Sequence, residues 1–244
     1  MQSRLLLSLV LLLTALMLTA QSSSLNLKVY LEGPYNASSE MMDTKLYDLG
    51  YLPGMKPKTF LATAVSSEDP YNPPTLKKSN TLDVSLYSQR SVDWILVSIV
   101  DDSGNTTWKG TLLLEANGHV VTDNIDDLTL DQEKKYKLVI SHRNHLPVQS
   151  PLVSVADGAL SFDFTTADIS GLKSIGDDYV LRGGALRISS DGSYIIEMSD
   201  IEEWKNSIGL NSSYLLADID MDGDVSVHDK SIILSNLDAS STLK

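Results

Sequence analysis

Residues 218–229 read Asp-Ile-Asp-Met-Asp-Gly-Asp-Val-Ser-Val-His-Asp, a run with the length of a calcium-binding loop. The side chains at the positions that supply ligands all carry oxygen. They are Asp218, Asp220, Asp222, Ser226 and Asp229 at loop positions 1, 3, 5, 9 and 12, with Asp224 at position 7, where the backbone carbonyl is the ligand. Gly223 stands at the sharp turn, and Val225 should point inward. Because Ca²⁺ takes about six to eight oxygen ligands, the pattern predicts one calcium ion; a solvated acidic turn is the alternative.

The end of this loop departs from the EF-hand pattern, because Asp229 stands where EF-hands usually have Glu. A short apolar helix pattern follows it, with Ile232, Ile233 and Leu237. With these features, residues 218–237 resemble the calcium-binding repeat of type I dockerins. The resemblance implies a small α-helical, dockerin-like domain over residues 183–244.

The same resemblance implies a protein partner. Dockerin repeats contact their cohesin partners through loop positions 10 and 11, which here are Val227 and His228. These two residues are therefore candidate partner-binding residues; an exposed pair without a role is the alternative. The partner would be a cohesin-like protein or the chain's own β domain.

A dockerin normally has two calcium repeats, and the first one is degenerate in this chain. If Asp191 and Gly192 are positions 5 and 6 of that loop, Arg187 occupies position 1, where its positive charge would repel Ca²⁺. We therefore expect one ion rather than two. The helix after this loop is still predicted, with Asp200 as N-cap and Glu203 completing a capping box.

Composition excludes several classes of protein. The chain has 244 residues, no cysteine and a net charge of -13. It therefore has no disulfide, no cysteine–zinc site and no thiol nucleophile. Residues 177–244 hold 13 acidic side chains against 5 basic ones, so the charge gathers near the calcium loop. An acidic surface of this kind disfavours nucleic acids and anionic lipids as partners.

The N-terminus has the pattern of a secretory signal peptide over residues 1–20. Arg4 precedes an apolar run from Leu5 to Leu18, and Ala20 offers a cleavage site before Gln21. An uncleaved anchor is the alternative, but the run is shorter than the roughly 20 residues that span a bilayer. We expect a secreted or cell-envelope protein of a bacterium, with no membrane span after cleavage.

Residues 21–170 read as a mainly β domain. Apolar and polar residues alternate from Leu25 to Glu32 and again from Ala159 to Phe164, and Trp94–Val100 is rich in β-branched residues. Asn117 and Gly118 form a hairpin signal. The predicted fold class is mainly β: an antiparallel β-sandwich, a linker over residues 171–182, and then the helical calcium-binding tail.

The β region also resembles a known module. The segments 28–36, 92–97 and 142–148 are similar to a recurrent module of secreted and cell-surface proteins from the Bacteroidetes group. Those proteins often carry the module just ahead of a dockerin-like segment. The resemblance implies architecture and compartment rather than an activity.

The search for catalytic residues is negative, and we expect no enzyme activity. The chain has none of the common nucleophile, zinc-protease, phosphate or dinucleotide motifs. His142 and His145 would diverge on a strand, so a shared metal is disfavoured there but possible in a turn. We expect calcium-dependent protein–protein assembly through the tail.

The alternative function is an adhesin or carbohydrate-binding accessory protein, with the β-sandwich as the binder. A sugar-stacking platform would use the loop tyrosines Tyr35, Tyr47, Tyr51 and Tyr71. These tyrosines would otherwise cover the edge of the sandwich.

Overall fold

The computed structural model describes residues 22–58, 65–71, 82–123, 125, 128–187, 193–210, 214–241 and 243. The expected signal peptide lies outside the described residues, as does the centre of the degenerate first loop at 188–192. Within the described ranges, no helix has the length and apolar character needed to span a bilayer.

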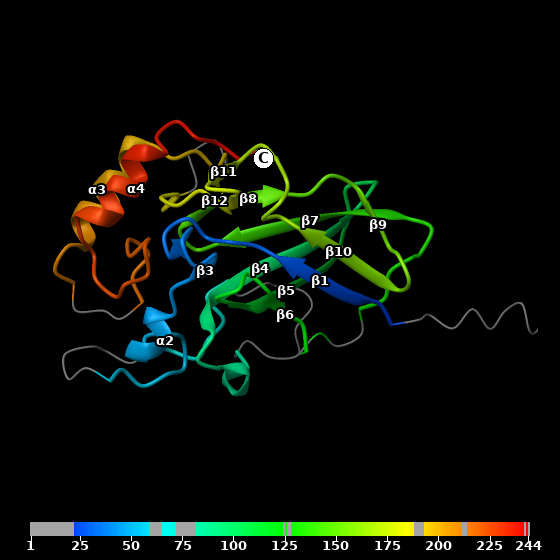
Figure 1. Ribbon diagram of the computed structural model, residues 1–244, viewed down its shortest axis with the longest axis horizontal. Coiled ribbons are helices and arrows are strands. Elements are labelled where there is room, and N and C mark those ends of the chain that lie inside the picture. The colour runs from blue at the N-terminus through cyan, green and yellow to red at the C-terminus, as the bar shows by residue number, and fades with distance from the viewer. Residues whose placement is uncertain are drawn as a thin grey trace, which may run out of the picture.

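The largest element is an antiparallel sheet in the order β6-β5-β4-β7-β8, with β9 also paired to β7 (Figure 1). Its strands are β4 (Ser91–Asp101), β5 (Thr106–Glu115), β6 (Val120–Val121), β7 (Lys135–His142), β8 (His145–Gln149) and β9 (Val153–Ser154). Ile95, Val97 and Ile99 alternate along β4 toward the core, as a strand with period two requires. The β-branched run of the sequence thus forms the central strand.

A second layer packs on this sheet. It holds the parallel pair β1 (Ser24–Lys28) and β10 (Ala159–Asp163), together with the small antiparallel pair β2 (Tyr35–Asn36) and β3 (Met41–Met42). Leu25 and Leu27 of β1 join the core residues of β4 in one apolar cluster. The mainly β, antiparallel class is confirmed, although the β1–β10 pair is parallel.

Residues 171–182, which the sequence indicated as a linker, instead form a β-hairpin. Its strands are β11 (Leu172–Ile175) and β12 (Asp178–Leu181), which pair in antiparallel register. Leu172, Val180 and Leu181 are buried in the main core. The linker prediction was wrong because the polar Gly176-Asp177 turn is typical of a linker, while the apolar residues on either side of it belong to strands.

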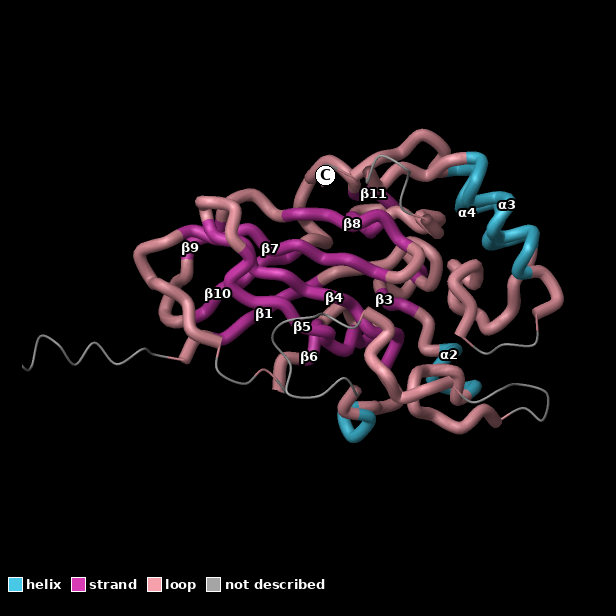
Figure 2. Tube along the Cα trace, turned by 180° about the vertical axis from the view of Figure 1, so that it is seen from behind, coloured by secondary structure: helices cyan, strands magenta, loops and turns pink. Residues whose placement is uncertain are grey.

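The helices are short and lie mainly at one end of the molecule (Figure 2). They are α2 (Lys45–Leu49), the 3-10 turn η1 (Val84–Leu86), α3 (Met198–Ser207) and α4 (Val227–Ser235). The predicted start of α3 was wrong. Glu197 is its N-cap and Asp200 is the third helical residue, whose carboxylate accepts a hydrogen bond from the Glu197 amide at 2.7 Å.

The C-terminal segment shares its core with the β body. Leu146 of β8 packs in one cluster with Ile219, Val225 and Ile233, while Met221 belongs to the main core. The Trp204 indole of α3 donates a hydrogen bond to the Ser226 carbonyl at 2.7 Å. The β body therefore supports the calcium-loop segment directly.

Candidate metal centre

Three of the predicted ligands converge in the loop 218–229. One carboxylate oxygen from each of Asp218, Asp220 and Asp222 lies within 4.8 Å of the others. Short hydrogen bonds inside the loop hold this geometry: the Gly223 amide donates to Asp218 Oδ2 at 3.2 Å, and the Asp224 amide donates to Asp222 Oδ1 at 2.9 Å. The spacing read from the sequence thus brings three carboxylates to one point.

The Asp218 carboxylate is buried, and among the described residues its Oδ1 atom has no hydrogen-bond partner. Burial raises the pKa of Asp218 to about 8; Arg143 opposes this rise, and repulsion from Asp229, Asp220 and Asp222 adds to it. Burial and the same kind of repulsion raise the pKa of Asp220 to about 7. A buried acceptor without a partner is costly, and a bound cation would satisfy it and relieve the repulsion. The donor set, which is oxygen only, suits a hard cation such as Ca²⁺.

The turn and the apolar position of the loop lie where the sequence predicted them. Gly223 has a φ of 91°, which glycine adopts without strain. Val225 is buried beside Ile233, so its inward orientation is confirmed.

Asp229 has a different place from the other three aspartates. Its Oδ1 accepts hydrogen bonds from the amides of Ile219 at 2.6 Å and Asp220 at 3.1 Å, and its Oδ2 accepts one from Ser226 at 2.7 Å. Ser226 is the N-cap of α4 and accepts from the His228 amide at 3.0 Å. Asp229 and Ser226 thus close the loop onto the helix, and Asp224 is exposed. As metal ligands, these three residues remain predictions.

The loop rests on the turn between β7 and β8. The Asn144 side-chain amide donates to the carbonyls of Leu216 at 3.1 Å and Asp218 at 2.8 Å. The Arg143 guanidinium donates to the Leu215 carbonyl. This turn therefore fixes the backbone that leads into the first ligand position.

A buried carboxylate holds this turn in place. Asp93 of β4 accepts hydrogen bonds from Arg143 Nε at 2.9 Å, the Tyr214 hydroxyl at 2.5 Å and the Trp94 amide at 2.8 Å. Its Oδ2 also lies 3.2 Å from His142 Nε2. Burial alone would raise the pKa of Asp93, but Arg143, His142 and Tyr214 together lower it below its ordinary range. Asp93 is therefore an ionised anchor, and we name Asp93, His142, Arg143, His145 and Tyr214 the junction cluster.

The two histidines meet because they flank a two-residue turn. His142 Nδ1 lies 3.0 Å from His145 Nδ1, and His145 Nδ1 lies 2.8 Å from Asn144 Oδ1. Asp93 can only accept, so His142 carries its proton on Nε2 and accepts from His145 on Nδ1. The two rings therefore converge at the turn instead of diverging as they would on a strand, and they pack in the hairpin between Asp93 and Asn144.

A second set of contacts holds the far end of α4. Glu32, just after β1, accepts hydrogen bonds from the Gly183 amide at 2.9 Å and from Asn236 Nδ2 at 2.5 Å, and it pairs with Lys173. Asn236 is the C-cap of α4. The calcium-loop repeat is thus attached to the β body at both ends.

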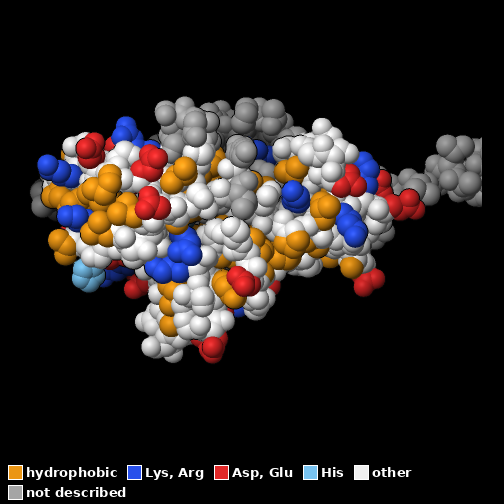
Figure 3. Space-filling model, turned by 90° about the horizontal axis from the view of Figure 1, so that it is seen from above, with side chains coloured by type: hydrophobic (Ala, Val, Ile, Leu, Met, Phe, Trp, Pro, Cys, Tyr) orange, Lys and Arg blue, Asp and Glu red, His pale blue; other side chains and the backbone are white. Residues whose placement is uncertain are grey.

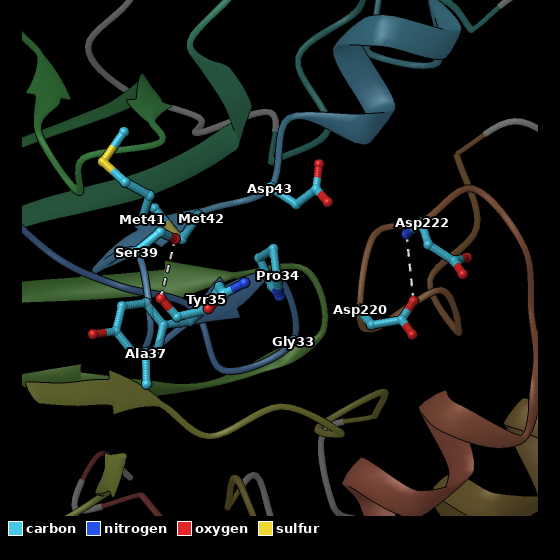
Figure 4. A pocket seen from close by; sticks show the side chains of 11 residues that line it. Gly33, Pro34, Tyr35, Ala37, Ser39, Met41, Met42, Asp43, Asp220 and Asp222 are labelled. Atoms are coloured by element: carbon cyan, nitrogen blue, oxygen red, sulfur yellow. Dashed lines mark hydrogen bonds between the residues drawn. The ribbon is translucent and has the colours of Figure 1, made fainter. Parts of the chain in front are cut away.

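An open groove of about 560 Å³ runs between the loop and the β2–β3 segment (Figure 4). Asp220 and Asp222 lie on one side of it, and Tyr35, Met41 and Asp43 line the other side. Asp220 and Asp222, two of the predicted ligands, therefore line a groove that is open to solvent.

The loop tyrosines do not form an exposed sugar platform. Tyr51 is buried, and Tyr35 and Tyr47 are partly buried against the main core. The Tyr71 hydroxyl donates to the Trp94 carbonyl at 2.8 Å. These side chains cover the sandwich, as the alternative interpretation of the sequence held.

The junction cluster was not predicted from the sequence, although the sequence contains a signal for it. Asp93 is a charged residue in the apolar run Val92–Val97, and a buried charge requires a partner. Nothing in the sequence shows that Arg143 and Tyr214 supply that partner.

Close packing at Gly33 gives a first testable prediction. A Cβ atom at Gly33 would overlap the backbone carbonyl of Ile219 in the loop. We expect Gly33→Ala to lower the free energy of unfolding by roughly 1–3 kcal/mol, because neither backbone can move without breaking its contacts. Urea denaturation would measure this, with the exposed Ser38→Ala as control. Equal stability of the two variants would show that the loop does not pack on Gly33.

The junction cluster also predicts sensitivity to acid. Burial lowers the pKa of His142, and it lowers that of His145 well below the ordinary value. The other groups that face this pair are the charged Asp93 and Arg143 and the neutral Tyr71 and Tyr214. Unfolded histidine titrates near pH 6.5, so below that pH the unfolded chain binds more protons than the folded chain. The contribution of the two histidines to stability should therefore fall as the pH drops from about 7 to 5, by up to about 1.4 kcal/mol per pH unit for each histidine.

The comparison of His145→Gln with the parent chain tests this expectation. The loop carboxylates have raised pKa values and give the opposite trend, but they are common to both proteins and cancel in the difference. The variant should lose less stability on acidification than the parent chain, while the exposed control His119→Gln should match the parent. Identical pH profiles for all three proteins would contradict the role of His145.

No protein-family model matches the chain, and no curated protein matches it. Solved structures that match include chains from two interface mutants of a type II cohesin–X-dockerin complex from Acetivibrio cellulolyticus. The C-terminal interface mutant aligns with a TM-score of 0.46 and 14% identity, over 91% of this chain and 99% of that chain. The N-terminal interface mutant aligns with a TM-score of 0.39 and 21% identity, over 61% of this chain and 83% of that chain. Both likenesses are too distant to assign a function.

Proposed function

We propose that the chain is a non-enzymatic protein-interaction module that is stabilised by one calcium ion and acts outside the cell. Asp218, Asp220 and Asp222 would hold the ion, with Ser226, Asp229 and the carbonyl of Asp224 as further ligands. The observation that carries the proposal is the convergence of three carboxylates around the buried, unpartnered Asp218 Oδ1. Bound calcium would neutralise this cluster and so order the loop between its two attachments to the β body.

The surface for a partner lies on α3 and α4. Seven large apolar side chains are exposed among the described residues, and five of them fall between residues 198 and 234. They are Met198, Ile208, Leu210, Val227 and Leu234. Apolar side chains gather at this end of the molecule (Figure 3). Exposed apolar residues that cluster in this way are typical of protein interaction sites.

One side of α4 is buried and the opposite side is exposed. Asp229, Ile233 and Asn236 are buried toward the loop and the β body. Val227 is 67% exposed and Leu234 is 47% exposed, on the opposite side. The sequence left open whether the tail contacts a second protein or its own β domain. The proposal combines the two alternatives. The inner side of α4 packs on the chain's own β body, and the outer side would bind a cohesin-like partner.

The extracellular compartment rests on the signal-peptide pattern and the composition of the chain. Loops of modest affinity are filled outside cells, where calcium-binding modules work at about 10⁻⁴–10⁻³ M. The proposed ion would therefore be bound throughout the life of the secreted protein.

Capture experiments test the proposed function. The chain without residues 1–20 would be immobilised and exposed to purified cohesin domains, with calcium or with a chelator. We expect capture that requires calcium and that Val227→Asp abolishes, because the new charge would face an apolar contact. Lys205→Asp, on an exposed position of α3 outside the apolar set, is the charge control. Capture that persists in the chelator, or that Val227→Asp leaves unchanged, would refute the proposal.

A further inference from the structure

The large sheet carries a groove on the face that points away from the main core. The groove has a volume of about 430 Å³, within the range of roughly 300–1,000 Å³ that ligand pockets have. Its floor follows the strand register: Ser98 of β4 pairs with Lys109 of β5 and Val139 of β7, and Leu96 pairs with Ser141 of β7. These residues alternate with the core positions of β4, so their side chains stand on the outer face.

The groove is the part of this sheet face that other segments of the chain do not cover. At one end, Trp94 and Leu113 of the same face are covered by Leu82 and Leu86. On the other side, residues 185–187, Tyr194 and Leu243 form the wall. Arg143, His142 and His145 of the junction cluster, with Tyr71, line the groove as well.

The lining has a charge opposite to that of the chain. The chain has 32 acidic residues against 19 basic ones, yet among the described residues no Asp or Glu lines the groove, whereas Lys109, Arg143 and Arg187 do. Among the described residues, neither Lys109 nor Arg187 forms an ion pair. Arg143 Nη2 is buried and has no hydrogen-bond partner within the described part of the chain. The groove therefore offers unused positive charge and unused N–H donors in a protein that is otherwise acidic.

Hydroxyl groups accompany these cations. Ser98 and Ser141 stand on the floor and Tyr194 in the wall, and in the described part of the chain their hydroxyls form no hydrogen bond with the protein. A hydroxyl both donates and accepts, so it complements the hydroxyls of a sugar. Lys and Arg complement a carboxylate, which accepts charge-assisted hydrogen bonds from them.

We propose that this groove binds an acidic oligosaccharide, with Lys109 and Arg187 as the residues that recognise its carboxylates. An acidic peptide is the less favoured ligand, because extended peptides gain affinity by pairing with a free strand edge, whereas this floor is made of side chains on the face of paired strands. The groove does not include the aspartates of the calcium loop, so the proposal stands independently of the proposed metal.

Calorimetric titration with trigalacturonate, at about 0.15 M NaCl to screen non-specific attraction, tests the proposal. The neutral galactotriose and the acidic peptide triglutamate are the comparison ligands. Lys109→Ala and Arg187→Ala are the test variants; Lys109 is partly exposed and Arg187 is exposed, so both should fold. Lys205→Ala removes the same charge from an exposed site outside the groove.

We expect the parent chain to bind trigalacturonate and not galactotriose or triglutamate. Each groove variant should lose about tenfold or more in affinity, since a charge-assisted hydrogen bond contributes roughly 1.5–3 kcal/mol. Lys205→Ala should bind like the parent chain. Absence of binding, equal binding of either comparison ligand, or an equal loss in Lys205→Ala would overturn the proposal.

Uronic acids also chelate calcium, so a further variant is needed to show whether trigalacturonate binds in the groove or at the calcium loop. Asp222→Asn changes the calcium loop and leaves the groove intact. It should retain full affinity for trigalacturonate. A loss of binding in this variant, with Lys109→Ala unaffected, would place the sugar at the calcium loop and refute the groove as its site.

Discussion

Chelation of calcium should lower the unfolding temperature of this chain by roughly 5–10 °C, and the double variant Asp218→Asn, Asp222→Asn should lose that dependence. At a calcium concentration about 100 times the dissociation constant, binding to the folded state alone adds about 2.7 kcal/mol. For a chain of this size, each kcal/mol shifts the unfolding temperature by about 2–4 °C. Differential scanning calorimetry with and without EDTA would measure the shift.

The stability of the double variant in EDTA also tests whether residues 218–229 are a metal site or only an acidic turn. In the parent chain, the carboxylates of Asp218, Asp220 and Asp222 repel one another, and Asp218 is buried without a partner for Oδ1. Asparagine has nearly the same shape and removes two of these charges. In EDTA the variant should therefore be at least as stable as the parent chain. A parent chain whose unfolding temperature ignores calcium would show that residues 218–229 are only a turn.

The same calorimetric scan tests how the tail is attached. The sequence analysis placed the calcium loop in a separate domain behind a linker. In the structure, Leu146 of β8 packs with Ile219 and Ile233, and Asn144 binds the Asp218 carbonyl. We therefore expect calcium to shift one cooperative transition of the whole chain. Two transitions, with only the smaller one responding to calcium, would indicate an independent tail.

The candidate site divides into parts that the sequence could and could not predict. The convergence of three carboxylates was predictable because Asp218, Asp220 and Asp222 lie within five residues, so their spacing alone sets their geometry. The place of Asp229 was not predictable, because its carboxylate accepts hydrogen bonds from amides within the loop and from the amide of Ser226, the N-cap of α4, and only the folded backbone defines these donors.

Long-range contacts explain the remaining differences. The strands β1 and β10 were both predicted, but their parallel pairing joins residues 135 positions apart, and no local pattern encodes it. Asp93 meets Arg143 and Tyr214 across 50 and 121 positions. The segment 171–182 was mistaken for a linker because its turn is polar, while burial of its apolar residues depends on strands far away in the sequence.

Loss of the Asp93 carboxylate should have the largest effect on folding of any single change in the junction cluster. Arg143 is nearly buried, with its side chain 7% exposed, and Asp93 is its ion-pair partner at 2.9 Å. Asp93→Ala would leave this charge buried and unpaired, and breaking a buried ion pair on one side costs about 3–5 kcal/mol. The Tyr214 hydroxyl and the His142 ring would lose their acceptor as well. Guanidinium denaturation, followed through tryptophan fluorescence, would measure the loss against Asp102→Ala in the exposed β4–β5 turn.

Replacing both partners of the ion pair then shows whether the loss of stability comes from the unpaired charge or from the lost packing. In Asp93→Leu, Arg143→Met both charges are gone, and apolar replacement of a whole buried ion pair is often neutral or stabilising. Part of the lost stability should return, though not all, because Tyr214 and His142 remain without their acceptor. Calcium affinity should be lower in this double variant than in the parent chain, since residue 143 no longer binds the Leu215 carbonyl that leads into the loop. If the paired replacement were no more stable than Asp93→Ala, the unpaired charge could not be the cause of the loss, and the cluster would act through packing alone.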